Sequence, residues 1–166
     1  MVIQRVDIQL VDSFTNLAFT GSPLASDNPN ILDDYEEGTF TPALSATGST
    51  FSIATAIGTY VKVGQNVTFT LSITLNTSGN TLTANALSVT GLPFTNHSVP
   101  YVFHVKWTNS ASSFANMQGY LFTGGTSLDI YALISGTSMV AANANTALHP
   151  TNGAVLEISG SYRANA

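Results

Sequence analysis

The chain has 166 residues, a formal net charge of −5, and only 8% of its residues are Asp, Glu, Lys or Arg. Soluble domains average about 25% charged residues. This chain instead has ample Val, Ile, Leu and Phe to bury, which excludes a disordered chain and suits one domain with a core. Four scattered cations form no footprint for phosphate groups or anionic lipid, so we expect neither nucleic-acid binding nor membrane docking.

Cysteine is absent, which removes disulfides and thiolate metal sites. No run of about 18 apolar residues predicts a transmembrane helix. The first residues also lack the basic-then-apolar order of a secretory signal. We therefore expect no membrane insertion, and export by a route other than a signal peptide if the protein leaves the cell.

Residues 1–30 predict an extended N-terminal arm. Apolar and polar residues alternate over 2–11, as in a strand, but 15–30 have no period and contain Pro23 and Pro29. A short strand tethered by a long loop is unusual within a compact domain. We interpret the segment as an arm that packs on a neighbouring subunit or partner. The alternative is an edge strand added to its own domain.

An acidic stretch follows the arm and divides the chain in two. Residues 1–37 contain seven acidic residues and one arginine, a net −6, whereas residues 38–166 have a net charge of +1. Directly after the acids, residues 39–42 (TFTP) predict the first residues of a strand closed by proline. We therefore predict that an acidic turn leads into a β domain over residues 31–166, with Asp34 or Glu36 bonding backbone amides and Tyr35 packing on the sheet.

The clearest strand lies at residues 67–75. Val67, Phe69, Leu71, Ile73 and Leu75 alternate with Thr, Ser and Asn, which indicates a half-buried antiparallel strand. Residues 60–63 form the strand before it. The glycine of Gly64-Gln65 suits the first position of a type II′ hairpin turn.

Further strands are predicted near residues 39–44, 86–90, 101–107, 117–123, 127–134 and 154–162. Phe103 and Val105 share the apolar face of one of these strands, and Leu156 and Ile158 that of another. Gly124-Gly125 predicts a second hairpin, and residues 138–148 a helical turn or two. About eight strands with regular turn signals predict an all-β, antiparallel, jelly-roll-like β-sandwich.

No catalytic site is predicted. Residues 135–139 (SGTSM) resemble the nucleophile segment of subtilisin-like proteases, but the Asp and His motifs that Ser138 would need are missing. A glycosidase needs two facing carboxylates, and beyond residue 37 only Asp129 and Glu157 could supply one. We therefore expect no enzyme.

No cofactor or metal site is predicted either. His97, His104 and His149 have no metal-ligand spacing. Calcium binding by the acidic stretch is an open alternative, although its spacing is not that of a calcium loop.

The string LDDYEEGTFTP at residues 32–42 resembles LDDYEEGTWTP, which opens a β-module in many bacteriophage virion proteins, chiefly tail fibres. Residues 58–64 (GTYVKVG), 91–94 (GLPF) and 158–163 (ISGSYR) are similar to later parts of the module. Phe40 stands where Trp is more usual. The resemblance implies a structural motif made of Asp33, Asp34, Tyr35, Glu36, Glu37, Gly38, Phe40 and Pro42. It also implies a trimer.

These observations favour a non-enzymatic bacteriophage virion structural protein on the particle surface, of the tail-fibre, receptor-binding type, made in the host cytoplasm. It would contact other virion proteins through residues 1–30 and host saccharide or protein through loops and polar sheet faces. The alternative is a capsid decoration protein anchored by its arm, favoured by the absence of a fibre shaft. A secreted carbohydrate-binding module is a more distant possibility.

Overall fold

The computed structural model describes residues 35–97, 99–133 and 138–165. The arm predicted for residues 1–30 lies outside these ranges, as do Asp33 and Asp34. Within them the chain is almost entirely β-structure, which confirms the predicted all-β class. No helix among the described residues is long and apolar enough to cross a membrane.

The described residues form ten strands and one short helix. They are β1 (Tyr35–Phe40), β2 (Ala43–Ser45), β3 (Ile53–Val63), β4 (Asn66–Leu75), β5 (Ser88–Thr90), β6 (Tyr101–Thr108), β7 (Asn116–Leu121), β8 (Leu128–Leu133), β9 (Met139–Ala141), α1 (Ala144–Ala147) and β10 (Val155–Arg163). Each strand pairs with its neighbours in the antiparallel sense.

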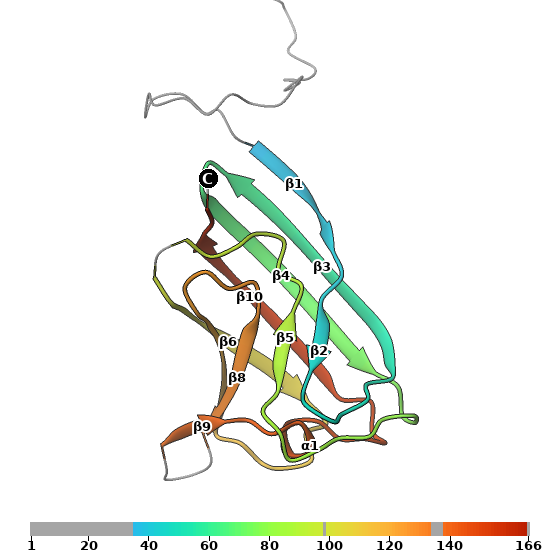
Figure 1. Ribbon diagram of the computed structural model, residues 1–166. Helices are drawn as coiled ribbons and strands as arrows, with labels where there is room; N and C mark the ends of the chain where they lie inside the picture. The colour runs from blue at the N-terminus through green and yellow to red at the C-terminus, as the bar shows by residue number, and fades with distance from the viewer. Residues whose placement is uncertain (1–34, 98, 134–137, 166) are drawn as a thin grey trace, which may run out of the picture.

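The strands form one curled sheet that folds over into two layers (Figure 1). Its order is β1-β3-β4-β10-β6-β7-β8-β5-β2, with β9 beside β8. β6 turns the corner between the layers, because residues 105–108 pair with β10 and residues 101–104 with β7. On the opposite side, Thr41 and Pro42 connect β1 in the first layer to β2 in the second. This is the predicted antiparallel sandwich, and its jelly-roll connectivity stays a prediction.

The core lies between the two layers and is built by alternation along the strands. The predicted inward residues of β4 are buried, with exposed fractions of 0–4%: Val67, Phe69, Leu71, Ile73 and Leu75. Thr68 and Thr70 between them are exposed. The predicted facings of β6 and β10 are confirmed in the same way. Edge-to-face contacts of Phe69 with Phe103 and Tyr162, at centroid distances of 5.2 and 5.9 Å, join β4, β6 and β10.

The predicted hairpins are confirmed. Val63 pairs with Asn66 across the two-residue turn. Gly64 has a φ of 57° and Gln65 an ordinary negative φ, as the predicted turn type requires. Gly124, with a φ of 73°, lies in the loop between β7 and β8, which pair from Leu121 and Leu128 onward.

Three sequence predictions are corrected. The predicted strand at 39–44 is the end of one strand and the start of another, because Thr41-Pro42 passes between the layers. β3 begins at Ile53 rather than near residue 60, because its first half pairs with residues 72–75 of β4. Residues 138–148 form β9 beside β8 before the single turn of α1, so only part of that segment is helical.

Candidate functional site

Residues 33–42 contain the motif that the resemblance singles out, here called the acidic motif, and its residues Tyr35–Phe40 form strand β1 at the edge of the first layer. Tyr35, Glu36, Glu37, Gly38 and Phe40 all lie in this strand and pair with β3. The prediction of an acidic turn is therefore wrong for Glu36 and Glu37. Charged side chains are well tolerated there, since an edge strand has one side open to solvent.

Two tyrosines hold the carboxylates of this motif. The Tyr60 hydroxyl donates a hydrogen bond to Glu36 Oε1 at 2.5 Å, and the Tyr35 hydroxyl donates one to Glu37 Oε2 at 2.8 Å. Both hydrogen bonds raise the pKa of the tyrosine that donates. Glu36 thus bonds a side chain of β3, where the sequence predicted a backbone amide. Tyr35 is 40% exposed, where packing on the sheet was expected.

Two glycines of β1 and β3 lie beneath aromatic rings of the opposite strand. Gly38 pairs with Tyr60 and Gly58 pairs with Phe40. A Cβ added at Gly38 would lie 2.8 Å from the Tyr60 hydroxyl, and one at Gly58 would lie 2.5 Å from the Phe40 ring. Each ring therefore occupies the space that a side chain would need. The aromatic residue at position 40 and the glycines of the motif are explained by this interlock, which joins β1 to β3.

The remaining described residue of the motif is Pro42. Pro42 follows β1 and is buried where the chain passes between layers. No group of three or more His, Cys, Asp or Glu side chains suited to a metal ion occurs among the described residues. Asp33 and Asp34 lie outside those residues, so the calcium alternative stays open.

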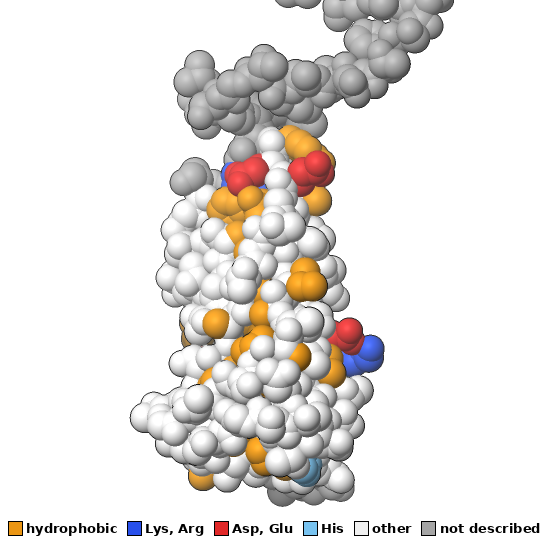
Figure 2. Space-filling model, turned by 90° about the vertical axis from the view of Figure 1, so that its right-hand side faces the viewer, with side chains coloured by type: hydrophobic (Ala, Val, Ile, Leu, Met, Phe, Trp, Pro, Cys, Tyr) orange, Lys and Arg blue, Asp and Glu red, His pale blue; other side chains and the backbone are white. Residues whose placement is uncertain are grey.

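The middle of the outward side of the first layer is uncharged, with Glu37, Lys106, Glu157 and Arg163 around it. We define the uncharged face by its outward side chains, which come from β3, β4 and β10: Ile57, Thr59, Val61, Thr68, Thr70, Ser72, Ser159 and Ser161. Hydroxyl pairs link neighbouring strands across it, Thr59 to Thr70 at 2.9 Å and Thr68 to Ser161 at 2.8 Å. Figure 2 shows a side of the molecule where charged side chains gather in only a few places.

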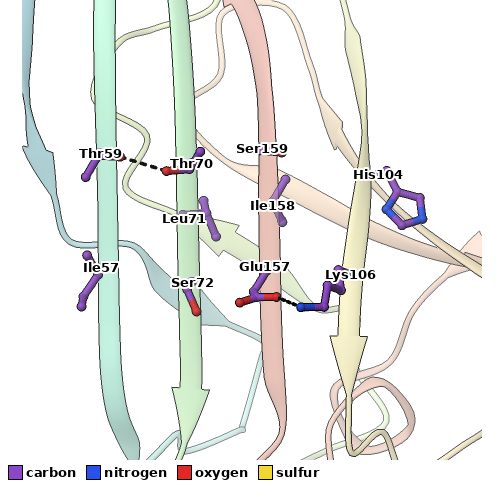
Figure 3. A pocket seen from close by; sticks show the side chains of 10 residues that line it. All are labelled: Ile57, Thr59, Thr70, Leu71, Ser72, His104, Lys106, Glu157, Ile158 and Ser159. Atoms are coloured by element: carbon purple, nitrogen blue, oxygen red, sulfur yellow. Dashed lines mark hydrogen bonds and ion pairs between the residues drawn. The ribbon is translucent and has the colours of Figure 1, made fainter.

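A shallow depression of about 540 Å³ lies over the uncharged face (Figure 3). Thr59, Thr70 and Ser159 form one row across it, and a second row ends in the ion pair of Lys106 with Glu157. Both partners of that pair are largely exposed, at 68% and 41%, so water screens their attraction and the pair adds little stability. A second depression lies beside the first, over β1, β3 and β4.

The outward side of the second layer carries a cluster of aromatic side chains. We define the aromatic patch as Gln118, Tyr120, Phe122, Tyr131 and Met139, which line a depression of about 350 Å³. The Tyr120 ring lies 4.7 Å from that of Phe122 and 6.0 Å from that of Tyr131, centroid to centroid. The sequence prediction missed this patch, because it assigned residues 117–123 and 127–134 to strands without assigning their facing.

Ser138 of the protease-like string has no histidine base beside it among the described residues. Ser138 is exposed directly before β9, and none of the described histidines forms a hydrogen bond with it. His104 lies outward on β6 opposite Gln118, and His149 bonds Thr151 in the next turn. The two carboxylates weighed for glycoside hydrolysis are both engaged. Asp129 accepts a hydrogen bond from Ser88 at 2.8 Å, and Glu157 forms its ion pair with Lys106.

Comparison with solved structures identifies a similar fold. The chain is similar to the Dettilon tailspike protein (gp208), with a TM-score of 0.66 and 15% sequence identity. The match covers 79% of this chain and 24% of the tailspike chain, so this chain spans about a quarter of that protein's length. At this identity the match shows a shared fold and assigns no residue a role. No protein-family model and no curated protein matches the chain.

Proposed function

We propose that this chain is a structural protein of a bacteriophage particle, exposed on its surface as part of a tail fibre or tailspike, where it contributes to host attachment. The observation that carries the proposal is the fold similarity to a tailspike protein over 79% of the chain. The sequence string LDDYEEGTFTP supports it independently, because it resembles the opening of a β-module in phage virion proteins.

We further propose that the chain acts by binding rather than by catalysis. A glycosidase active site needs two carboxylates facing each other, roughly 5–10 Å apart across a groove. Asp129 lies on β8 of the second layer and Glu157 on β10 of the first layer, and each is engaged by its own neighbour. Because the two carboxylates lie in different layers, this arrangement favours a binding function over glycoside hydrolysis, in which both acids would act on one substrate.

The uncharged face supports a contact between copies of the chain. Its Thr and Ser residues have short side chains, which lose little rotamer entropy when they are buried. Ile57 adds apolar area, since its side chain is 61% exposed. We propose that this face is covered in a homotrimer, the symmetry that the sequence resemblance implies. Contacts with other virion proteins would then use segments outside the sandwich.

The experiment that tests the function is immunogold labelling of the phage particles that carry this protein. Antibody raised against the purified chain should label the tail, and excess chain added to host cells should reduce adsorption of the phage. Labelling of the head would replace the proposal with the capsid decoration alternative. Particles without label would remove the chain from the virion altogether.

A further inference from the structure

The aromatic patch has no structural explanation within the fold. In β7, Met117, Gly119 and Leu121 point into the core, so Gln118 and Tyr120 point outward. In β8, Leu128, Ile130 and Ala132 are buried, so Asp129 and Tyr131 point outward. The rings of the patch therefore lie on the solvent side of the sheet. Phe122 extends the cluster from the end of β7 and is 47% exposed.

The sheet register surrounds these rings with hydrogen-bonding groups. Tyr120 is opposite Asp129, and Gln118 is opposite Tyr131. Within the described part of the chain, neither the Tyr120 nor the Tyr131 hydroxyl forms a hydrogen bond. Asp129 uses Oδ1 to accept from Ser88, and none of the described side chains donates to its second oxygen. The surface thus combines ring faces with donors and acceptors that no described side chain occupies and that a ligand could reach.

This combination matches one class of small ligand. A pyranose ring has an apolar side of C–H groups, whose positive polarisation attracts the negative face of an aromatic ring. Its hydroxyl groups need donors and acceptors at the rim of the stacking surface. A depression of about 350 Å³ is of the size found for small-molecule sites, about 300–1,000 Å³.

The charge around the patch selects among saccharides. Asp129 is the charged side chain closest to it in the register, and the nearest cation on that side of the described sheet is Lys106, beyond His104 on β6. An acidic sugar would meet a carboxylate with no cation to offset it. We propose that the aromatic patch binds a neutral saccharide, stacked on Tyr120 and Tyr131 and hydrogen-bonded by Gln118 and Asp129. This inference rests on the proposed attachment function and gives it a site and a ligand class.

The test uses the full chain and immobilised tetrasaccharides of neutral glucose, mannose and galactose, with tetragalacturonate as the acidic probe. At least one neutral probe should bind, and saturation-transfer NMR should show its C–H protons against protein rings. Tyr120→Ala and Tyr131→Ala should each weaken binding at least about fivefold. Tyr120→Phe should retain most of the affinity, and Asp129→Asn should allow tetragalacturonate to bind.

The control is Asn152→Ala, which removes an exposed side chain from the turn before β10, outside both the aromatic patch and the uncharged face, and should leave binding unchanged. Circular dichroism verifies that every variant retains its β-structure. Binding of the acidic probe alone, binding unaffected by both alanine variants, or no binding to any neutral probe would each overturn the inference. If antibody labels the tail and the Tyr120→Ala chain still reduces phage adsorption as the natural chain does, the saccharide inference is wrong but the attachment function stands. A protein receptor would then be the better candidate.

Discussion

Adjacent residues of β4 lie in opposite environments, and the difference can be measured. Leu71 is 4% exposed in the core, whereas Thr70 points into solvent and shares a hydrogen bond with the exposed Thr59 hydroxyl. Leu71→Ala should lower the free energy of unfolding by about 2–5 kcal/mol, because it removes buried methyl groups and leaves a cavity. Thr70→Ala should cost less than about 1 kcal/mol. Urea denaturation gives both values, and equal costs would contradict the register of β4.

The interlock between β1 and β3 gives a second prediction at single positions. A Cβ at Gly58 would lie 2.5 Å from the Phe40 ring, so Gly58→Ala forces that ring away from the core it packs against. We expect a loss of about 1–3 kcal/mol in the free energy of unfolding.

Gly119→Ala is the control for this prediction. A Cβ at Gly119 would find Leu128 at 3.6 Å, which is an ordinary contact, so that change should cost less than about 1 kcal/mol. Combining Gly58→Ala with Phe40→Leu should cost less than the two single changes together, since the first has already displaced the ring. Strict additivity in chemical denaturation would show that the ring and the glycine do not interact.

At the scale of whole elements, the sequence predicts the strands whose two faces differ. β4, β6 and β10 bury one apolar set and expose one polar set, so their alternation alone assigns both position and facing. The first half of β3 escapes this reasoning because Ile57 points outward and Ala56 lies on the core side. The hydrophobic alternation is lost there, and only pairing with β4 makes these residues a strand.

The aromatic patch could not be predicted for a related reason. Tyr120 and Tyr131 have the same chemistry whether they face the core or the solvent, and an aromatic residue in a strand usually indicates burial. The available signal is the identity of their neighbours, Leu121 and Ile130, which occupy the inward positions. The acidic motif was located from sequence, but the hydrogen bond to Glu36 comes from Tyr60, which only the register of β1 with β3 brings close.

Tyr162 anchors a connecting segment to strand β10. Its hydroxyl donates a hydrogen bond to the Phe94 carbonyl at 2.8 Å, and burial raises the pKa of Tyr162 to about 12. The unfolded value is about 10. A raised pKa means that the folded chain holds the phenol proton more tightly. This contribution to stability is therefore complete below pH 10 and is lost as the pH rises through about 12, by at most roughly 3 kcal/mol.

The variant Tyr162→Phe isolates this effect, since it retains the ring and removes the titrating group. Urea denaturation at several pH values should show a constant stability advantage of the natural chain from neutral pH to about pH 10. That advantage should then shrink towards pH 12, while the titration of other residues cancels in the difference. An advantage that held steady up to pH 12 would contradict the assignment of the raised pKa to Tyr162.

At the scale of the whole molecule, the sandwich is closed at both sides by continuous chain. β6 pairs with both layers, and Thr41-Pro42 leads directly from the first layer to the second. The two edge strands of the sheet, β1 and β2, therefore follow one another in the sequence. Each pairs with a neighbouring strand on one side only. The broad outward side of the first layer is different, because nothing in the described chain covers it.

The uncharged face leads to the prediction that the protein is a stable trimer. Monomeric domains usually keep charged residues on exposed strands, where they prevent association. The eight side chains in the middle of this outward side are uncharged, whereas Glu37, Lys106, Glu157 and Arg163 lie around them. Ile57 and Val61 are exposed by 61% and 38%. Burial of such a face between subunits removes apolar area from water, and its hydroxyl groups can exchange hydrogen bonds across the contact.

Sedimentation equilibrium at micromolar concentration and moderate salt should give three times the 17.4 kDa mass of one chain. Thr70→Glu should dissociate the trimer without unfolding the sandwich, because association would bury an unpaired carboxylate in the middle of the face. Val102→Glu places the same charge on the outward side of β6, at a site 51% exposed, and should leave the mass unchanged. A natural chain that sediments as a monomer at every concentration would contradict the covered face, and a mass of two chains would retain the contact but replace threefold symmetry with twofold.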